Sequence, residues 1–166
     1  MPLIKDGAFA EDGFVFVPDG HALPDNGGVI VTLSRFQSET ANLLAHHAPL
    51  GVRLAAGENP EVLKDELSRI AVIVLEFPVF KDGRGFSWAR MLRERFDYKG
   101  EIRATGHFLY DQIAFLIRVG FDAFEVRQDF RIEDFQRALG EMRYVYQPAM
   151  DRTQAILELR ARKNPV

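Results

Sequence analysis

The sequence predicts an α/β fold of alternating βα units around a mainly parallel sheet of five or six strands, arranged as an open sheet or a partial (β/α) barrel. From residue 29 onward, short apolar runs alternate with helical patterns, as in parallel strands joined by covering helices. The run AVIVLEF at residues 71–77 is apolar almost throughout, which is typical of a strand buried on both faces, so it is expected at the centre of the sheet. The length of 166 residues suits one domain and falls short of the roughly 250 residues of a closed eight-stranded βα barrel.

The elements follow from local signals. Strands are expected at residues 29–33, 51–55, 71–77, 101–105 and 122–126. Helices are expected at about residues 34–47, 60–68, 87–96, 108–119 and 132–142. Ser34 and Gln37 have the spacing of a capping box, in which the two side chains satisfy free backbone donors at a helix start. Asn59 and Pro60 suit the N-cap and first turn of the second helix, and Gly120 suits the left-handed residue that ends the fourth.

The two ends of the chain differ from this pattern. Residues 1–28 are rich in Gly, Asp and Pro around the short apolar piece FVFV, and are expected to form a loop or an antiparallel edge hairpin. Residues 147–166 are expected to form a turn and a polar helical tail that projects or docks on another subunit. Because a partial barrel leaves sheet edges unshielded, we expect a homodimer.

Composition excludes several classes of function. A net charge of -3 leaves no broad basic surface for nucleic acid. Glu76 and Pro78 interrupt the longest apolar run and the first residues lack an apolar signal centre, so a cytoplasmic protein without a membrane span is expected. With no cysteine, the chain has no disulfides, no thiolate nucleophile and no cysteine-bound zinc or iron–sulfur site. The four histidines lack ligand spacing, so no metal is predicted, and the cofactor stays open.

The segment FKDGRGFSWAR at residues 80–90 is the most distinctive polar stretch. Loops that follow parallel strands meet at one edge of the sheet, where ligands usually bind. Glycines on both sides of Arg84 can aim backbone amides at an anion ahead of a helix, and the guanidinium suits a carboxylate, phosphate or sulfur oxyanion. The alternative is a glycine turn with a solvated arginine and Ser87 as the N-cap. The predicted anion-binding residues are Asp82, Gly83, Arg84, Gly85, Ser87, Arg90, Arg103 and Asp111.

Three residues at the same rim are candidates for acid–base catalysis. Glu76 and Glu125 end predicted strands, where a buried carboxylate must be paired or neutral. Pairing of Glu76 with Arg84 or Arg103 is the structural alternative. His107 could act as an acid or a base at the start of a helix, and a purely structural histidine is the alternative.

A spaced set of residues then suggests a family. The set comprises Asp82, Gly83, Arg84, Ser87, Ala89, Arg90, Leu92, Arg93, Gly100, Glu101, Arg103, Ala104, Gly106, Asp111, Gln112 and Gly120 to Ala123. With it, residues 80–125 resemble an uncharacterised bacterial domain-of-unknown-function family associated with assimilatory sulfite reduction.

The resemblance implies an accessory protein of the sulfite reductase machinery, using the arginine-rich rim to bind a small anion or a partner surface. The reductase itself holds sirohaem and an iron–sulfur cluster, which a chain without cysteine cannot bind in the usual way. The alternative is a small enzyme acting on an anionic substrate. In that enzyme Glu76 or His107 would handle protons, and Arg84 with Arg103 would hold an oxyanion.

Overall fold

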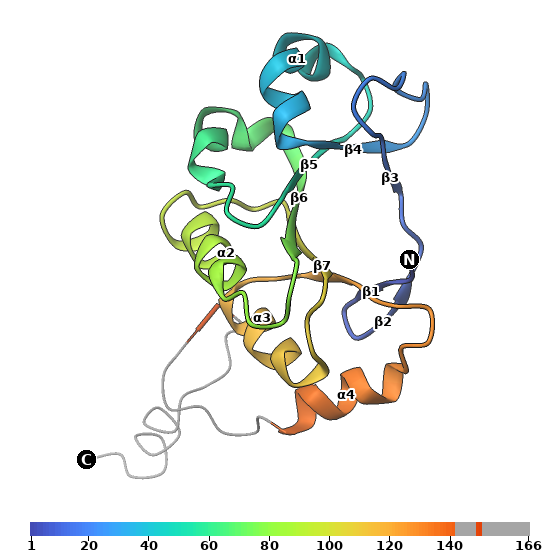
Figure 1. Cartoon of the computed structure of the whole chain (residues 1–166), viewed down its shortest axis with the longest axis vertical. Coiled ribbons are helices and arrows are strands. Elements are labelled where there is room, and N and C mark those ends of the chain that lie inside the picture. The colour runs from blue at the N-terminus through green and yellow to red at the C-terminus, as the bar shows by residue number, and fades with distance from the viewer. Residues whose placement is uncertain (142–148, 151–166) are drawn as a thin grey trace, which may run out of the picture.

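A computed structural model describes residues 1–141 and 149–150 of the chain as an α/β fold with a curled, open sheet and helices outside it (Figure 1). The strands are β1 (Leu3–Lys5), β2 (Ala8–Ala10), β3 (Phe14–Phe16), β4 (Gly28–Thr32), β5 (Leu50–Leu54), β6 (Ile70–Phe77), β7 (Glu101–Gly106) and β8 (Ala123–Glu125). The α-helices are α1 (Leu33–Ala45), α2 (Arg84–Glu94), α3 (Ile113–Val119) and α4 (Ile132–Glu141). Two segments are 3-10 helices, η1 (Pro60–Arg69) and η2 (Tyr110–Gln112).

The sheet has eight strands in the order β2-β1-β8-β7-β6-β5-β4-β3. Strands β3 to β8 are parallel neighbours in chain order, whereas β1 pairs antiparallel with both β2 and β8. The five predicted strands are present to within about two residues, but the predicted total of five or six is too low. The other three strands all lie in the first 28 residues, where a loop or an antiparallel edge hairpin was predicted. Strands β1 and β2 form an antiparallel pair at one edge, whereas β3 in the FVFV piece pairs parallel with β4 at the other edge. Three residues are too short to show the periodic pattern that would have located each strand.

The two faces of the sheet have different contents. Because the parallel strands follow one another in chain order, their crossovers lie on one face, and the helices pack there. Alternate residues such as Ile73 and Leu75 of β6 point into this outer, wholly apolar core. Only a small apolar cluster, Ile30, Val72 and Val74 with Phe14 beside it, lies on the inner face. Charged side chains also lie on the inner face, among them Arg53, Glu76, Glu101, Arg103 and Glu125.

A short link across the sheet requires the curl. Ala10 ends β2 and Phe14 begins β3, the two opposite edges of the sheet, so residues 11–13 alone join them. Such a link spans at most about 14 Å, whereas eight flat strands would separate their edges by roughly 34 Å. The sheet is therefore curled like a partial barrel, and the link crosses its open side. It also brings together the edges whose exposure suggested a homodimer, which stays a prediction.

The observed helix starts differ in part from those predicted from local sequence signals. Helix α1 begins at Leu33 with Thr32 as N-cap, whose hydroxyl accepts a hydrogen bond from the Arg35 amide, so the predicted capping box at Ser34 is wrong. Asn59 does cap η1, although that segment is a 3-10 helix. Helix α2 begins at Arg84, ahead of the predicted Ser87, which therefore lies inside the helix.

The fourth predicted helix is divided into η2 and α3, and Gly120 ends α3 with a φ of 109° as predicted. The predicted tail at residues 147–166 lies outside the described residues, apart from 149 and 150. Within the described part of the chain, no helix is both long and apolar enough to cross a membrane.

Two helical glycines test whether packing outweighs helix propensity. A Cβ atom on Gly85 in α2 would lie 2.5 Å from the Phe77 ring, whereas one on Gly140 in α4 would meet no atom of the described residues within 4 Å. We expect Gly85→Ala to lower the free energy of unfolding by about 1–3 kcal/mol because the ring must move. Gly140→Ala is expected to raise it by about 0.5–1 kcal/mol. Urea unfolding of both variants measures this, and equal effects would contradict the packing at Phe77.

Candidate functional site

Arg103 occupies the centre of the inner face and binds three carboxylates. Its side chain is 1% exposed. Its Nη1 and Nη2 atoms donate to the two oxygens of Asp12 at 2.7 and 3.1 Å. Nε donates to Glu101 at 2.9 Å, and Nη1 also donates to Glu125 at 3.1 Å. A buried charge needs this many partners, because each lost contact leaves desolvation uncompensated.

Strand register explains how these groups meet. Glu101, Arg103 and Thr105 alternate along β7 and so share the inner face. Thr105 donates a hydrogen bond to Glu125 of β8 at 2.6 Å, and Lys5 of β1 pairs with Glu101 at 2.6 Å. Burial acts to lower the pKa of Arg103, but the hydrogen bond that Arg103 donates to Asp12 and the charge of Glu101 outweigh it and hold that pKa above its usual value. The cluster is therefore a hydrogen-bonded network around the Arg103 guanidinium.

Glu76 lies beside this network but has a different partner. Nε and Nη2 of Arg53 on β5 donate to its carboxylate at 3.2 and 3.1 Å, and both side chains are about one-third exposed. The Arg53 guanidinium lies 5.3 Å from the centre of the Phe16 ring. The structural alternative of pairing with Arg84 or Arg103 is therefore replaced by pairing with Arg53, which the sequence did not indicate. Only the register of β5 against β6 brings the two together.

The Asp-Gly-Arg segment binds its own carboxylate. Arg84 donates to Asp82 through Nε at 2.9 Å and Nη2 at 2.6 Å, and its backbone amide donates to the same side chain at 3.1 Å. These bonds lower the pKa of Asp82 to about 2. Gly83 has an ordinary φ of -84°, and Gly85 is needed for contact with Phe77, so neither glycine shapes a cradle of amides. The Asp82 carboxylate therefore occupies the position at the start of α2 where an external anion was predicted to bind.

The predicted site residues fall into separate places. Glu76, Asp82 and Arg84 line a hollow of about 10 Å³, which is too small for a ligand. Arg103 and Glu125 lie on the inner face. Ser87 is exposed on α2, where Arg90 pairs with Glu94 at 2.9 Å, and Asp111 is exposed in η2. Arg103 is held by Asp12, Glu101 and Glu125.

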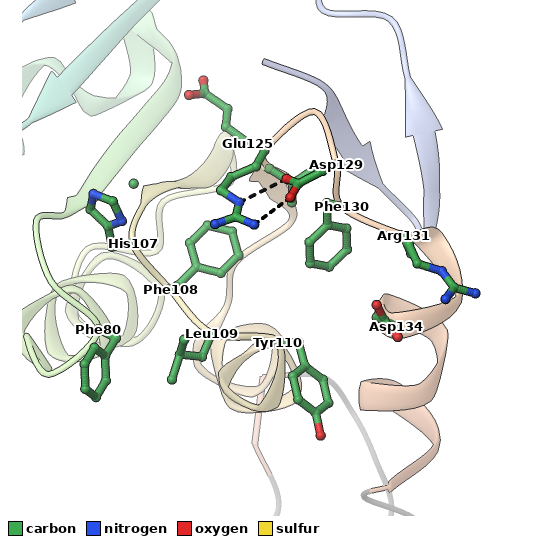
Figure 2. A pocket seen from close by; sticks show the side chains of 13 residues that line it. Phe80, His107, Phe108, Leu109, Tyr110, Glu125, Asp129, Phe130, Arg131 and Asp134 are labelled. Atoms are coloured by element: carbon green, nitrogen blue, oxygen red, sulfur yellow. Dashed lines mark hydrogen bonds and ion pairs between the residues drawn. The ribbon is translucent and has the colours of Figure 1, made fainter.

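A larger groove lies at the carboxyl ends of β7 and β8. Its volume is about 410 Å³, and its lining includes His107, Phe108, Tyr110, Glu125, Arg127 and Arg131. Gly106, with a φ of 95°, turns the chain from β7 into this groove, a conformation that favours glycine. In the view of Figure 2, His107 lies on one side and Arg131 on the other, with the rings of Phe108 and Phe130 between them.

The charged groups of the groove are solvated pairs. Arg127 donates to Asp129 through Nε at 3.1 Å and Nη2 at 2.7 Å, with the two side chains 78% and 67% exposed. Arg131 lies 3.6 Å from Glu133. Sequence reasoning missed both arginines, although they follow the last predicted strand, where the rim rule would have found them. Across residues 1–141 and 149–150, no three His, Asp or Glu side chains are grouped to hold a metal ion.

Comparison with known families now identifies the chain's relatives. Residues 51–157 match the family described as bacterial protein of unknown function (DUF934). The chain belongs to this family. None of the curated proteins compared with it matches. The DUF934 match includes Arg103, Glu125 and the groove, whereas Asp12 lies outside it. The family resemblance is thereby confirmed, and the link to sulfite reduction stays a prediction.

Proposed function

We propose that this DUF934 protein binds a small anion, or the anionic group of a larger ligand, in the groove that follows β7 and β8. The groove itself carries the proposal. Its volume of about 410 Å³ lies within the roughly 300–1,000 Å³ of small-molecule sites. Aromatic walls with a few charged groups are the usual composition of such sites.

Arg127 is the residue best suited to meet the anion. Its partner Asp129 is exposed, and exposed ion pairs contribute only about 0–1 kcal/mol. A ligand carboxylate or oxyanion can therefore replace Asp129 on the same guanidinium fork at little cost. His107 and Arg131 lie in the same lining and would add donors from either side.

Binding is favoured over the enzyme alternative. That alternative needs Glu76 or His107 to share one space with Arg84 and Arg103. Arg103 is enclosed by three carboxylates on the inner face, and Arg84 is engaged by Asp82 at a separate small hollow. Glu125 donates nothing while ionised and is already accepting from Arg103 and Thr105. These contacts give the charged residues structural partners without a reaction.

The biological setting that we propose is assimilatory sulfite reduction, where the protein would act as an accessory to the reductase machinery. This part of the proposal rests on the family resemblance and on the chemistry of the groove, since sulfite is a small oxyanion of the kind that an arginine fork accepts. It does not depend on a homodimer.

The groove is tested by thermal shift with sulfite, sulfate, sulfonates, phosphorylated metabolites and nicotinamide nucleotides at constant ionic strength. A ligand at about 100 times its Kd should raise the Tm by roughly 5–10 °C. Arg127→Ala should raise the Kd of that ligand about 10- to 100-fold, because the substitution removes a charge-assisted hydrogen-bond donor.

Two arginines outside the groove provide matched controls. Arg90→Ala removes an exposed arginine that is paired with Glu94, and Arg84→Ala removes the one paired with Asp82. Both variants should keep the wild-type affinity. If Arg84→Ala lost binding and Arg127→Ala kept the wild-type affinity, the proposal for the groove would be overturned. The anion site would then lie at the Asp-Gly-Arg segment.

Deletion of the gene tests the accessory role. We expect the deletion strain to grow more slowly than its parent with sulfate or sulfite as sole sulfur source, and equally well with cysteine. Plasmid-borne wild type should restore growth and Arg127→Ala should not. Equal growth of deletion and parent on sulfite would contradict a role in sulfite reduction and leave the binding result untouched.

A further inference from the structure

The inner face holds a second arginine fork, and one of its partners differs in kind from the other two. Glu101 lies on the same strand as Arg103, and Glu125 lies on the neighbouring strand, so the sheet fixes both. Asp12 lies 91 residues away in sequence and reaches Arg103 from the link that crosses the open side of the curled sheet. Two partners therefore lie on strands of the partial barrel, and the third lies on the link across its open side.

The bond to Asp12 has the geometry with which arginine binds a ligand carboxylate. Nη1 and Nη2 each donate to a different oxygen of Asp12, at 2.7 and 3.1 Å. This end-on, two-oxygen arrangement suits carboxylates and other oxyanions with two free oxygens on one side. The Phe14 ring, centred 5.9 Å from the guanidinium carbon, forms one wall beside it.

The link that carries Asp12 is lightly held. Glu11, Asp12 and Gly13 are exposed residues, and a Cβ atom on Gly13 would meet nothing within 4 Å. The link is fastened by a hydrogen bond from the Gly28 amide to the Gly13 carbonyl at 2.8 Å, by one from the Phe14 amide to Asp12 Oδ1 at 3.0 Å, and by the pair of Asp12 with Arg103. The Asp12 side chain is 30% exposed while that of Arg103 is 1% exposed. Asp12 thus stands between the buried arginine and solvent.

We propose that Arg103 is the floor of an anion-binding site inside the curled sheet, and that the Asp12 carboxylate occupies this site as a built-in competitor. The ligand is an oxyanion with a two-oxygen face, such as a carboxylate, sulfite or phosphate. When the link lifts, the oxyanion takes the place of Asp12 on the fork, while Glu101 and Glu125 keep the guanidinium in position. The site is distinct from the groove beside Arg127 and does not rest on it.

Charge balance permits the exchange. With Asp12 lifted away, Arg103 and Lys5 face Glu101 and Glu125, so the cluster has two cations and two anions. In the closed protein Asp12 is a third anion beside these two cations, so the cluster carries one net negative charge, and one bound monoanion gives the same net charge. A monoanion therefore adds no charge beyond the one that the inner face is built to hold, and multiply charged anions should bind less well.

Chemical rescue of Asp12→Ala tests the proposal. This substitution empties the space of one carboxylate, and we expect the Tm to fall by about 6–20 °C because Arg103 loses a charged partner. Formate, which matches the missing group, should restore about 3–5 °C at ten times its Kd, with saturation. The Tm shifts with acetate, sulfite and phosphate, each compared with chloride at equal ionic strength, show which oxyanion binds best.

Three comparisons make the result decisive. Wild type should gain less than about 1 °C from formate, because Asp12 fills the site at high effective concentration. Asp12→Asn fills the space without charge and should be destabilised but not rescued. Glu94→Ala frees the exposed Arg90 and should show no formate effect beyond wild type. The proposal is supported if formate stabilises Asp12→Ala and none of the other variants. An Asp12→Ala protein that folds only when formate is present counts as the same result. The proposal would be overturned if formate raised the Tm of Asp12→Ala and of wild type equally. It would also be overturned if Asp12→Ala failed to fold in both formate and chloride.

Discussion

The bond between Arg103 and Asp12 is the contact on which the shape of this molecule most depends. Arg103 lies on a central strand, and Asp12 lies in the short link between the two edge strands. A buried arginine is costly to leave without partners, by about 3–5 kcal/mol when one is removed. The pair therefore holds over the inner face the short link that requires the sheet to curl, whereas a closed barrel would join its edges by continuous strand pairing.

This arrangement restricts where a ligand can bind. The outer face of the sheet is covered by helices over an apolar core, and the inner face is filled by paired charges. At the carboxyl ends of the parallel strands, a groove of about 410 Å³ lies beside β7 and β8. Its arginines are paired only with solvated acids, in contrast to Arg103. Glu125 thus contacts the enclosed arginine, Arg103, and lines the groove that contains the exposed one, Arg127.

The sequence predicted what is local and missed what depends on register or on distant segments. Strand β6 is continuous and apolar because both of its faces are buried, so it could be recognised directly. Strands of three residues gave no pattern, and nothing near Arg103 in the sequence points to Asp12, 91 residues away. The Asp-Gly-Arg segment did indicate an anion at Arg84, but a carboxylate two residues away was already in reach. Glu76 was expected to need a partner, and only the pairing of β5 with β6 supplies Arg53.

A double-mutant cycle between Asp12 and Arg103 tests the central claim most directly. Asp12→Asn, Arg103→Met and the double variant are compared with wild type by urea unfolding, and the coupling free energy is taken from the four stabilities. If the pair closes the curled sheet, the coupling should reach at least about 1.5 kcal/mol, with the double variant little less stable than Arg103→Met. Additive effects, with coupling below about 0.5 kcal/mol, would show that the link is held by something else and would contradict the account.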